Sequence, residues 1–135
     1  MSSIFTKIIN GEIPSYKIAE NDTCFAFLDI NPNTRGHTLC VPKQEVDHLF
    51  DLDDDTYGEL MAFSKTVGKA IGAVIPCERV GLSVIGLEVP HVHVHLIPLK
   101  QMRDTTFQHK VTLSKSDFEA TAAQIRAQLQ SPPSK

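Results

Sequence analysis

The chain has 135 residues, a formal net charge of −3 and 41% hydrophobic residues. These values predict one soluble globular domain over residues 1–135, and they argue against a basic surface that holds a nucleic acid polymer by neutralising its phosphates. No stretch has the length of a membrane span or the pattern of a signal peptide, and the widely spaced Cys24, Cys40 and Cys77 predict buried free thiols, so a cytoplasmic protein is expected.

Hydrophobic periodicity and turn residues divide the chain into helices and strands. In chain order, we expect a short helix over residues 3–10, strands over 16–19, 24–30 and 37–41, a long helix over 54–73, strands over 80–85 and 91–99, and a C-terminal helix and tail over 114–135.

The long helix is predicted from apolar residues at helical spacing. The acidic run Asp51–Asp55 precedes it and favours a first helical turn. Ser116 and Glu119 match a capping box at the start of the last helix. This order of elements predicts an α+β fold: an antiparallel β-sheet of about five strands with a long central helix and a short N-terminal helix. The residues expected on the buried face of the long helix are Leu60, Phe63, Val67, Ile71 and Val74.

Three histidines, His91, His93 and His95, alternate with hydrophobic residues and would share one face of a strand. Three interpretations fit this row. It could bind a metal, although on a regular strand His91 and His95 lie about 13 Å apart, too far for one zinc ion to take all three histidines. It could be a polar row without function. It could also attack phosphorus, because a neutral imidazole is a nucleophile near neutral pH and its neighbour can donate hydrogen bonds to phosphate oxygens.

The His-x-His-x-His pattern with apolar residues between resembles the signature of the histidine triad (HIT) family. The likeness extends from about residue 3 to about residue 100. The segments that carry it are Ser3–Ile9, Gly11–Pro14, Phe25–Pro32, Gly36–Leu39, Val41–Lys43 and Gly86–Pro98.

The resemblance implies a role for each matching residue. His93 corresponds to the nucleophile, His95 to the residue near the leaving group and His91 to a supporting histidine. His37 corresponds to a fourth histidine beside the nucleophile, and Asp29 to a carboxylate that accepts hydrogen bonds from the ribose hydroxyls. The residues that correspond to an apolar slot for the base are Phe5, Ile8, Phe27, Leu28 and Ile30, for which core packing is the alternative.

The sequence departs from the family pattern at several positions. Many members bind a structural zinc ion through two cysteines and two histidines, but Ser3, Thr6 and Glu45 stand in three of these places, so no metal or other cofactor is expected. Ser83 stands where an asparagine that contacts the nucleotide is usual. Glu88 falls where a small hydroxyl is common, and if it faces the site its charge disfavours anionic leaving groups.

The expected function is hydrolysis of a nucleoside 5′-monophosphate phosphoramidate or ester through a covalent nucleotidyl intermediate on His93. The alternatives are a dinucleoside polyphosphate hydrolase and a non-catalytic nucleotide-binding interaction module. The expected partners are a purine nucleotide and a second copy of the chain in a homodimer, with no nucleic acid polymer and no membrane.

Overall fold

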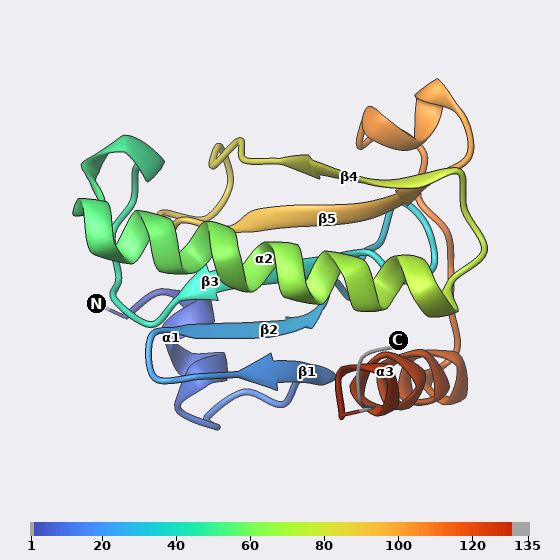
Figure 1. Ribbon diagram of the computed structural model, residues 1–135, viewed down its shortest axis with the longest axis horizontal. Coiled ribbons are helices and arrows are strands. Elements are labelled where there is room, and N and C mark those ends of the chain that lie inside the picture. The colour runs from blue at the N-terminus through green and yellow to red at the C-terminus, as the bar shows by residue number, and fades with distance from the viewer. Residues whose placement is uncertain (1, 131–135) are drawn as a thin grey trace, which may run out of the picture.

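The computed structural model describes residues 2–130, and it confirms the predicted α+β fold with a five-stranded antiparallel sheet (Figure 1). The predicted tail after residue 130 lies outside the described residues. The elements are α1 (Ile4–Ile9), β1 (Lys17–Glu20), β2 (Cys24–Leu28), β3 (Thr38–Pro42), α2 (Asp54–Val74), β4 (Arg79–Ser83), β5 (Val94–Leu99) and α3 (Lys115–Gln130).

The strand order is β1-β2-β3-β5-β4, so β5 lies between β3 and β4. The chain leaves the sheet after β3, forms α2, returns as the edge strand β4 and then inserts β5. Leu39 of β3 lies directly opposite His95 of β5, and Ser83 of β4 lies opposite the same histidine. This register places side chains from three separate segments around His95.

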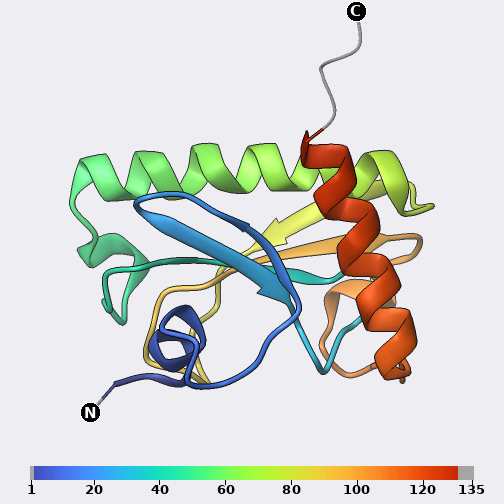
Figure 2. The same cartoon turned by 90° about the horizontal axis from the view of Figure 1, so that it is seen from below.

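Alternation along the strands divides their side chains between two faces of the sheet. On one face, Leu28 of β2 and Val94 of β5 pack with the buried side of α2, and α3 contacts both α2 and β1. On the other face, α1 lies against a smaller apolar cluster. Figure 2 shows α2 and α1 on opposite sides of the strands. The smaller cluster consists of Phe5, Phe25, Phe27, Leu39 and Val41.

The long helix α2 follows its predicted pattern. Leu60, Phe63, Val67 and Ile71 are buried, and Val74 is half-buried. Asp53 caps the helix by accepting a hydrogen bond from the amide of Thr56, so the acidic run is the polar start of the helix, as predicted. No helix within residues 2–130 has both the length and the apolar character that a bilayer crossing requires.

Two local predictions are wrong. The capping box at α3 joins Ser114 and Asp117, which exchange side-chain and backbone hydrogen bonds of 3.0 and 3.1 Å, and not Ser116 and Glu119. The strand expected from residue 91 begins only at Val94. The amides before it bond to loops instead of to a strand: that of His91 donates to Val89 O and that of Val92 to Val46 O, both at 2.8 Å.

Candidate active site

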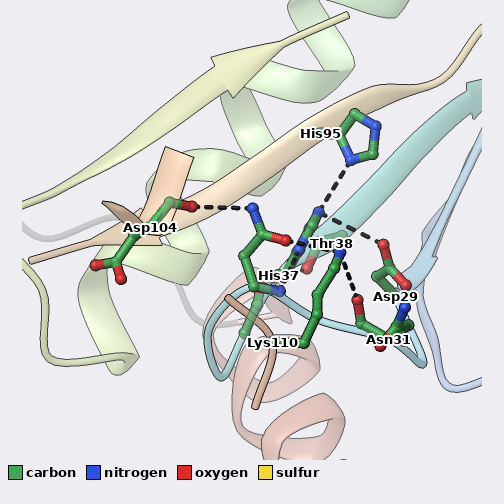
Figure 3. A network of polar contacts seen from close by, with 9 residues as sticks. Asp29, Asn31, His37, Thr38, His95, Asp104 and Lys110 are labelled. Carbon is green, nitrogen blue, oxygen red and sulfur yellow. Dashed lines mark hydrogen bonds and ion pairs between the residues drawn. The ribbon is translucent and has the colours of Figure 1, made fainter. Parts of the chain in front are cut away.

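The predicted site residues Asp29, His37 and His95 converge on the sheet face opposite α2 (Figure 3). Asp29 follows the end of β2, His37 immediately precedes β3, and His95 lies within β5. Leu39 lies opposite both Phe27 and His95, so these three side chains share one face of the sheet. Asp29 lies two residues after Phe27 and His37 two residues before Leu39, and their ligand atoms come within 4.8 Å of those of His95.

The tautomer of His93 follows from its one hydrogen bond. Its Nδ1 lies 2.7 Å from the carbonyl oxygen of His91. A carbonyl oxygen only accepts, so Nδ1 carries the proton and the lone pair of the neutral ring is on Nε2. The side chain is 6% exposed, and within residues 2–130 its Nε2 has no hydrogen-bond partner. His93 therefore presents a nucleophilic nitrogen that no protein group occupies.

The tautomers of His37 and His95 follow from a chain of donors. The backbone amide of Asn33 donates to His37 Nδ1 at 2.9 Å, so His37 carries its proton on Nε2. That Nε2 lies 3.0 Å from Nδ1 of His95, which must then accept. His95 consequently carries its proton on Nε2, which is free of protein partners among the described residues.

Burial keeps this pair neutral. Loss of solvation lowers the pKa of His37 to about 3, and the neighbouring His95 and Lys110 act in the same direction. Loss of solvation likewise lowers the pKa of His95 to about 4, with smaller effects from His93 and Lys110. Both rings are therefore neutral at pH 7, as the donor chain requires.

Asp29 lies beside the histidine pair. Its Oδ2 is 3.6 Å from His37 Nε2, and its Oδ1 accepts from the amide of Asn31 at 2.8 Å. Burial raises its pKa, although the Asn31 amide acts against this effect. The carboxylate is 18% exposed, so one face of it can accept hydrogen bonds from a ligand.

The structure brings together three of the five residues predicted for the apolar slot. Phe5 and Phe27 are buried with ring centres 5.6 Å apart, and the half-buried Ile8 packs against them. Phe5 also lies 4.9 Å from the ring of His93. Leu28 is a correction: strand alternation places it on the opposite face, in the core beneath α2. Ile30 is 74% exposed.

Ser83 and Glu88 remain candidate nucleotide-binding residues, each for a different reason. Ser83 shares the face of His95, and its buried Oγ has no hydrogen-bond partner within the described residues. A buried hydroxyl without a partner is unfavourable unless a water molecule or a ligand supplies one. Glu88 is exposed. Its negative charge contributes to raising the pKa of Asp29, so it is close enough to influence the charge of that carboxyl group.

The positions that hold zinc in many family members form a hydrogen-bonded cluster here. His91 donates from Nε2 to Pro42 O at 2.8 Å and accepts at Nδ1 from the Ser3 hydroxyl at 2.7 Å. Glu45 accepts from the amide of Ser3 and from the hydroxyl of Thr6. Two neutral hydroxyls replace the soft thiolates, a carboxylate replaces one of the two histidines, and both His91 nitrogens are already bonded. This donor set does not fit a structural zinc ion.

The ligand atoms of Asp29, His37 and His95 lie within 4.8 Å of one another, a spacing at which a metal ion could bridge them. The Asn33 amide argues against this use. An ion on His37 Nε2 would move the proton of that ring to Nδ1, where it would face the N–H of Asn33. Two donors would then oppose each other in a buried place. The arrangement therefore favours hydrogen bonding within the group over metal binding.

Sequence reasoning missed the residues that surround the histidine pair after β5. Phe107 and Lys110 come from a segment without hydrophobic periodicity, and Asn33 acts through its backbone amide, which no side-chain pattern reveals. The only available signal was the Asn-Pro-Asn sequence before His37, which indicates a turn.

Comparison with known proteins shows which family and which folds this chain resembles. The family profile of the HIT domain matches residues 10–102. An uncharacterized HIT-like protein of Borreliella burgdorferi is 36% identical over 131 residues, covering 90% of this chain and 94% of that protein. The adenosine 5′-monophosphoramidase of Schizosaccharomyces pombe is 39% identical over 99 residues, covering 73% and 74%. A Hit-like protein structure from Bartonella henselae has a TM-score of 0.82 at 29% identity, covering 94% of this chain and 96% of that one.

Proposed function

Because the chain belongs to the HIT domain family, we propose that it hydrolyses nucleoside 5′-monophosphate phosphoramidates or esters through a covalent nucleotidyl intermediate on His93. The observation that carries this proposal is the geometry of His93, whose Nδ1 is bonded to the His91 carbonyl while its Nε2 has no hydrogen-bond partner among the described residues. The relative in Schizosaccharomyces pombe, an adenosine 5′-monophosphoramidase, supports the substrate class.

The reaction has two steps. In the first, Nε2 of His93 forms a bond to phosphorus, and the bond from phosphorus to the leaving atom breaks with its electron pair on that atom. The leaving atom takes a proton from Nε2 of His95. The transient negative charge on the His37–His95 pair is balanced by the positive charge that His93 acquires. In the second step, water attacks phosphorus, the bond to His93 breaks, and a proton from the water returns to His95.

The remaining residues bind the substrate. Asp29 accepts hydrogen bonds from the ribose hydroxyls through its exposed face, and the Phe5–Phe27 cluster receives a purine base. The unpartnered hydroxyl of Ser83 donates to a phosphate oxygen beside His95. His91 orients His93 through its backbone carbonyl. Ile30 is exposed next to Asp29 and completes the edge of the base slot.

The proposal extends to the setting of the protein. A cytoplasmic location suits Cys24 and Cys40, which are free and buried, whereas Cys77 is only half-buried. Burial raises the pKa of the Cys24 thiol to about 11 and that of Cys40 to about 12, so both stay protonated. A homodimer is part of the same proposal, and sedimentation of the purified chain tests it.

Mass spectrometry of the protein after incubation with adenosine 5′-phosphoramidate tests the chemistry. We expect a nucleotidyl adduct on His93 and steady release of the nucleotide. His93→Ala should form no adduct and show no turnover, whereas His48→Ala, at an exposed histidine, should behave as the wild type. Tight nucleotide binding by the wild type without adduct or turnover would instead indicate a non-catalytic binding module. Faster cleavage of diadenosine polyphosphates would indicate a polyphosphate hydrolase.

A further inference from the structure

The segment after β5 covers the histidine pair. It contains a short 3-10 helix (Met102–Thr105) and then Phe107, whose ring centre lies 4.8 Å from that of His95 and 6.0 Å from that of His37. Phe107 has a φ of 62°, a left-handed conformation that is unfavourable for a bulky side chain. Such a conformation persists where the surrounding structure holds it, so tertiary contacts fix this segment over the pair.

Lys110 joins this segment to the loop that precedes His37. Its Nζ donates to Asn33 Oδ1 at 2.8 Å and to Asn31 O at 3.0 Å, as Figure 3 shows for Asn31, and it lies 5.0 Å over the Phe107 ring. The side-chain amide of Asn33 also donates to Asp104 O at 2.9 Å. Both polar atoms of the buried Asn33 side chain are therefore held by the segment after β5.

The backbone amide of the same asparagine selects the tautomer of the pair. It donates to His37 Nδ1, which places the His37 proton on Nε2 and the His95 proton on its own Nε2. If His37 instead carried its proton on Nδ1, its Nε2 would have to accept from His95 Nδ1. His95 would then present a bare Nε2 to the substrate and could not donate to a leaving atom.

We propose that Lys110, acting through Asn33, is a positioning residue that keeps His95 in the tautomer whose Nε2–H can protonate the leaving atom. This inference rests on the proposed function. Removal of Lys110 leaves Asn33 Oδ1 buried without its donor. The loop can relieve this by moving, which withdraws the backbone amide from His37 and frees the other tautomer.

The charge of Lys110 acts in the same direction as its hydrogen bonds. It contributes to lowering the pKa of both His37 and His95, so it disfavours a second proton on either ring. A doubly protonated His37 would place a proton on Nδ1, opposite the Asn33 amide. The hydrogen bonds and the charge therefore favour the same state of the pair.

NMR of the histidine ring nitrogens tests the inference without any activity measurement. Two-bond ¹H–¹⁵N correlations identify which nitrogen of His95 carries the proton. We expect Nε2–H in the wild type, in Lys110→Arg, which keeps the charge and the donors, and in Lys115→Met. Lys115 lies five positions further on, in α3, and is highly exposed, so this variant matches the change in charge. We expect Lys110→Met to populate the Nδ1–H form of His95.

Kinetics with two leaving groups provide the functional readout. An amine must be protonated to leave, whereas 4-nitrophenolate leaves as an anion. Lys110→Met should lower kcat for adenosine 5′-phosphoramidate about 100-fold, the scale of general acid catalysis, and leave kcat for the 4-nitrophenyl ester of AMP nearly unchanged. Lys110→Arg should restore the amine reaction.

The outcomes separate the two proposals. A wild type that forms no adduct on His93 with either substrate contradicts the proposed function. An active wild type in which Lys110→Met slows both substrates equally, or keeps the Nε2–H tautomer of His95, overturns the role of Lys110. If Lys110→Met does not fold, the wild-type spectrum still decides, because an Nδ1–H tautomer of His95 in the native protein is incompatible with the inference.

Discussion

Acidification should destabilise this fold through the buried His37–His95 pair. In the unfolded chain each imidazole has its ordinary pKa of 6.5, whereas in the folded protein the pKa is about 3 for His37 and about 4 for His95. Between these values the unfolded state binds more protons than the native state, so the free energy of unfolding falls as the pH falls. The stability is complete above about pH 6.5 and is lost progressively below it.

The magnitude follows from the width of this window. Each pH unit below 6.5 costs about 1.4 kcal/mol per histidine that stays neutral in the folded state, so each ring contributes about 2 kcal/mol at pH 5. The two together remove about 4 kcal/mol, a large share of the 5–15 kcal/mol typical of a domain. His91, whose pKa is also lowered by burial, adds to the same trend. Asp29, whose pKa is raised, opposes it at the acidic end.

Urea denaturation at pH 7, 6 and 5 measures the effect. The variant His37→Gln should lose only about half as much stability over this range as the wild type, because glutamine does not titrate. His48→Gln, at an exposed histidine, should lose as much as the wild type. An unchanged unfolding free energy at pH 5, or an equal loss in wild type and His37→Gln, would refute the buried neutral pair.

Three further variants test other parts of the site. Ser83→Ala should lower kcat/KM for adenosine 5′-phosphoramidate about tenfold, because it removes the proposed hydrogen bond to a phosphate oxygen, which is worth about 1.4 kcal/mol. An unchanged kcat/KM would show that Ser83 does not contact the substrate. Ser3→Ala removes the cap of α1 and the donor to His91, so it should lower the free energy of unfolding in urea by about 1–2 kcal/mol. Ser2→Ala, at the exposed neighbour, should cost nothing measurable, and equal stability of the two variants would argue against the hydrogen-bonded cluster around His91. Glu88→Ser should raise the rate with a diadenosine polyphosphate relative to that with the phosphoramidate, and a constant ratio of the two rates would rule out repulsion of the leaving group by Glu88.

Much of the fold could be predicted because hydrophobic residues recur at a clear helical or strand spacing in its elements. The helical spacing from Leu60 to Ile71 identified α2, and the alternation around His95 placed Val94 in the core and the histidine on the other face. The start of β5 was predicted too early because alternation describes where side chains point. It does not reveal that the amide of Val92 bonds to a loop at Val46 and not to a neighbouring strand.

The site was predictable only where a residue's chemistry resides in its side chain. The histidines and Asp29 stood out for this reason. Leu28 was wrongly assigned to the base slot because a motif of consecutive residues does not distinguish the two faces of a strand. The contributions of Asn33 and Lys110 depend on a backbone amide and on contacts over 77 residues of sequence. Neither leaves a local pattern in the chain.

The late insertion of β5 between β3 and β4 has a consequence during synthesis. His37 and His95 are separated by 58 residues, so a nascent chain on the ribosome that ends after α2 contains Asp29 and His37 but neither His93 nor His95. Such a chain also leaves the inner edge of β3 without its partner strand. The proposed site therefore forms only after translation has passed β5, so incomplete translation products lack it.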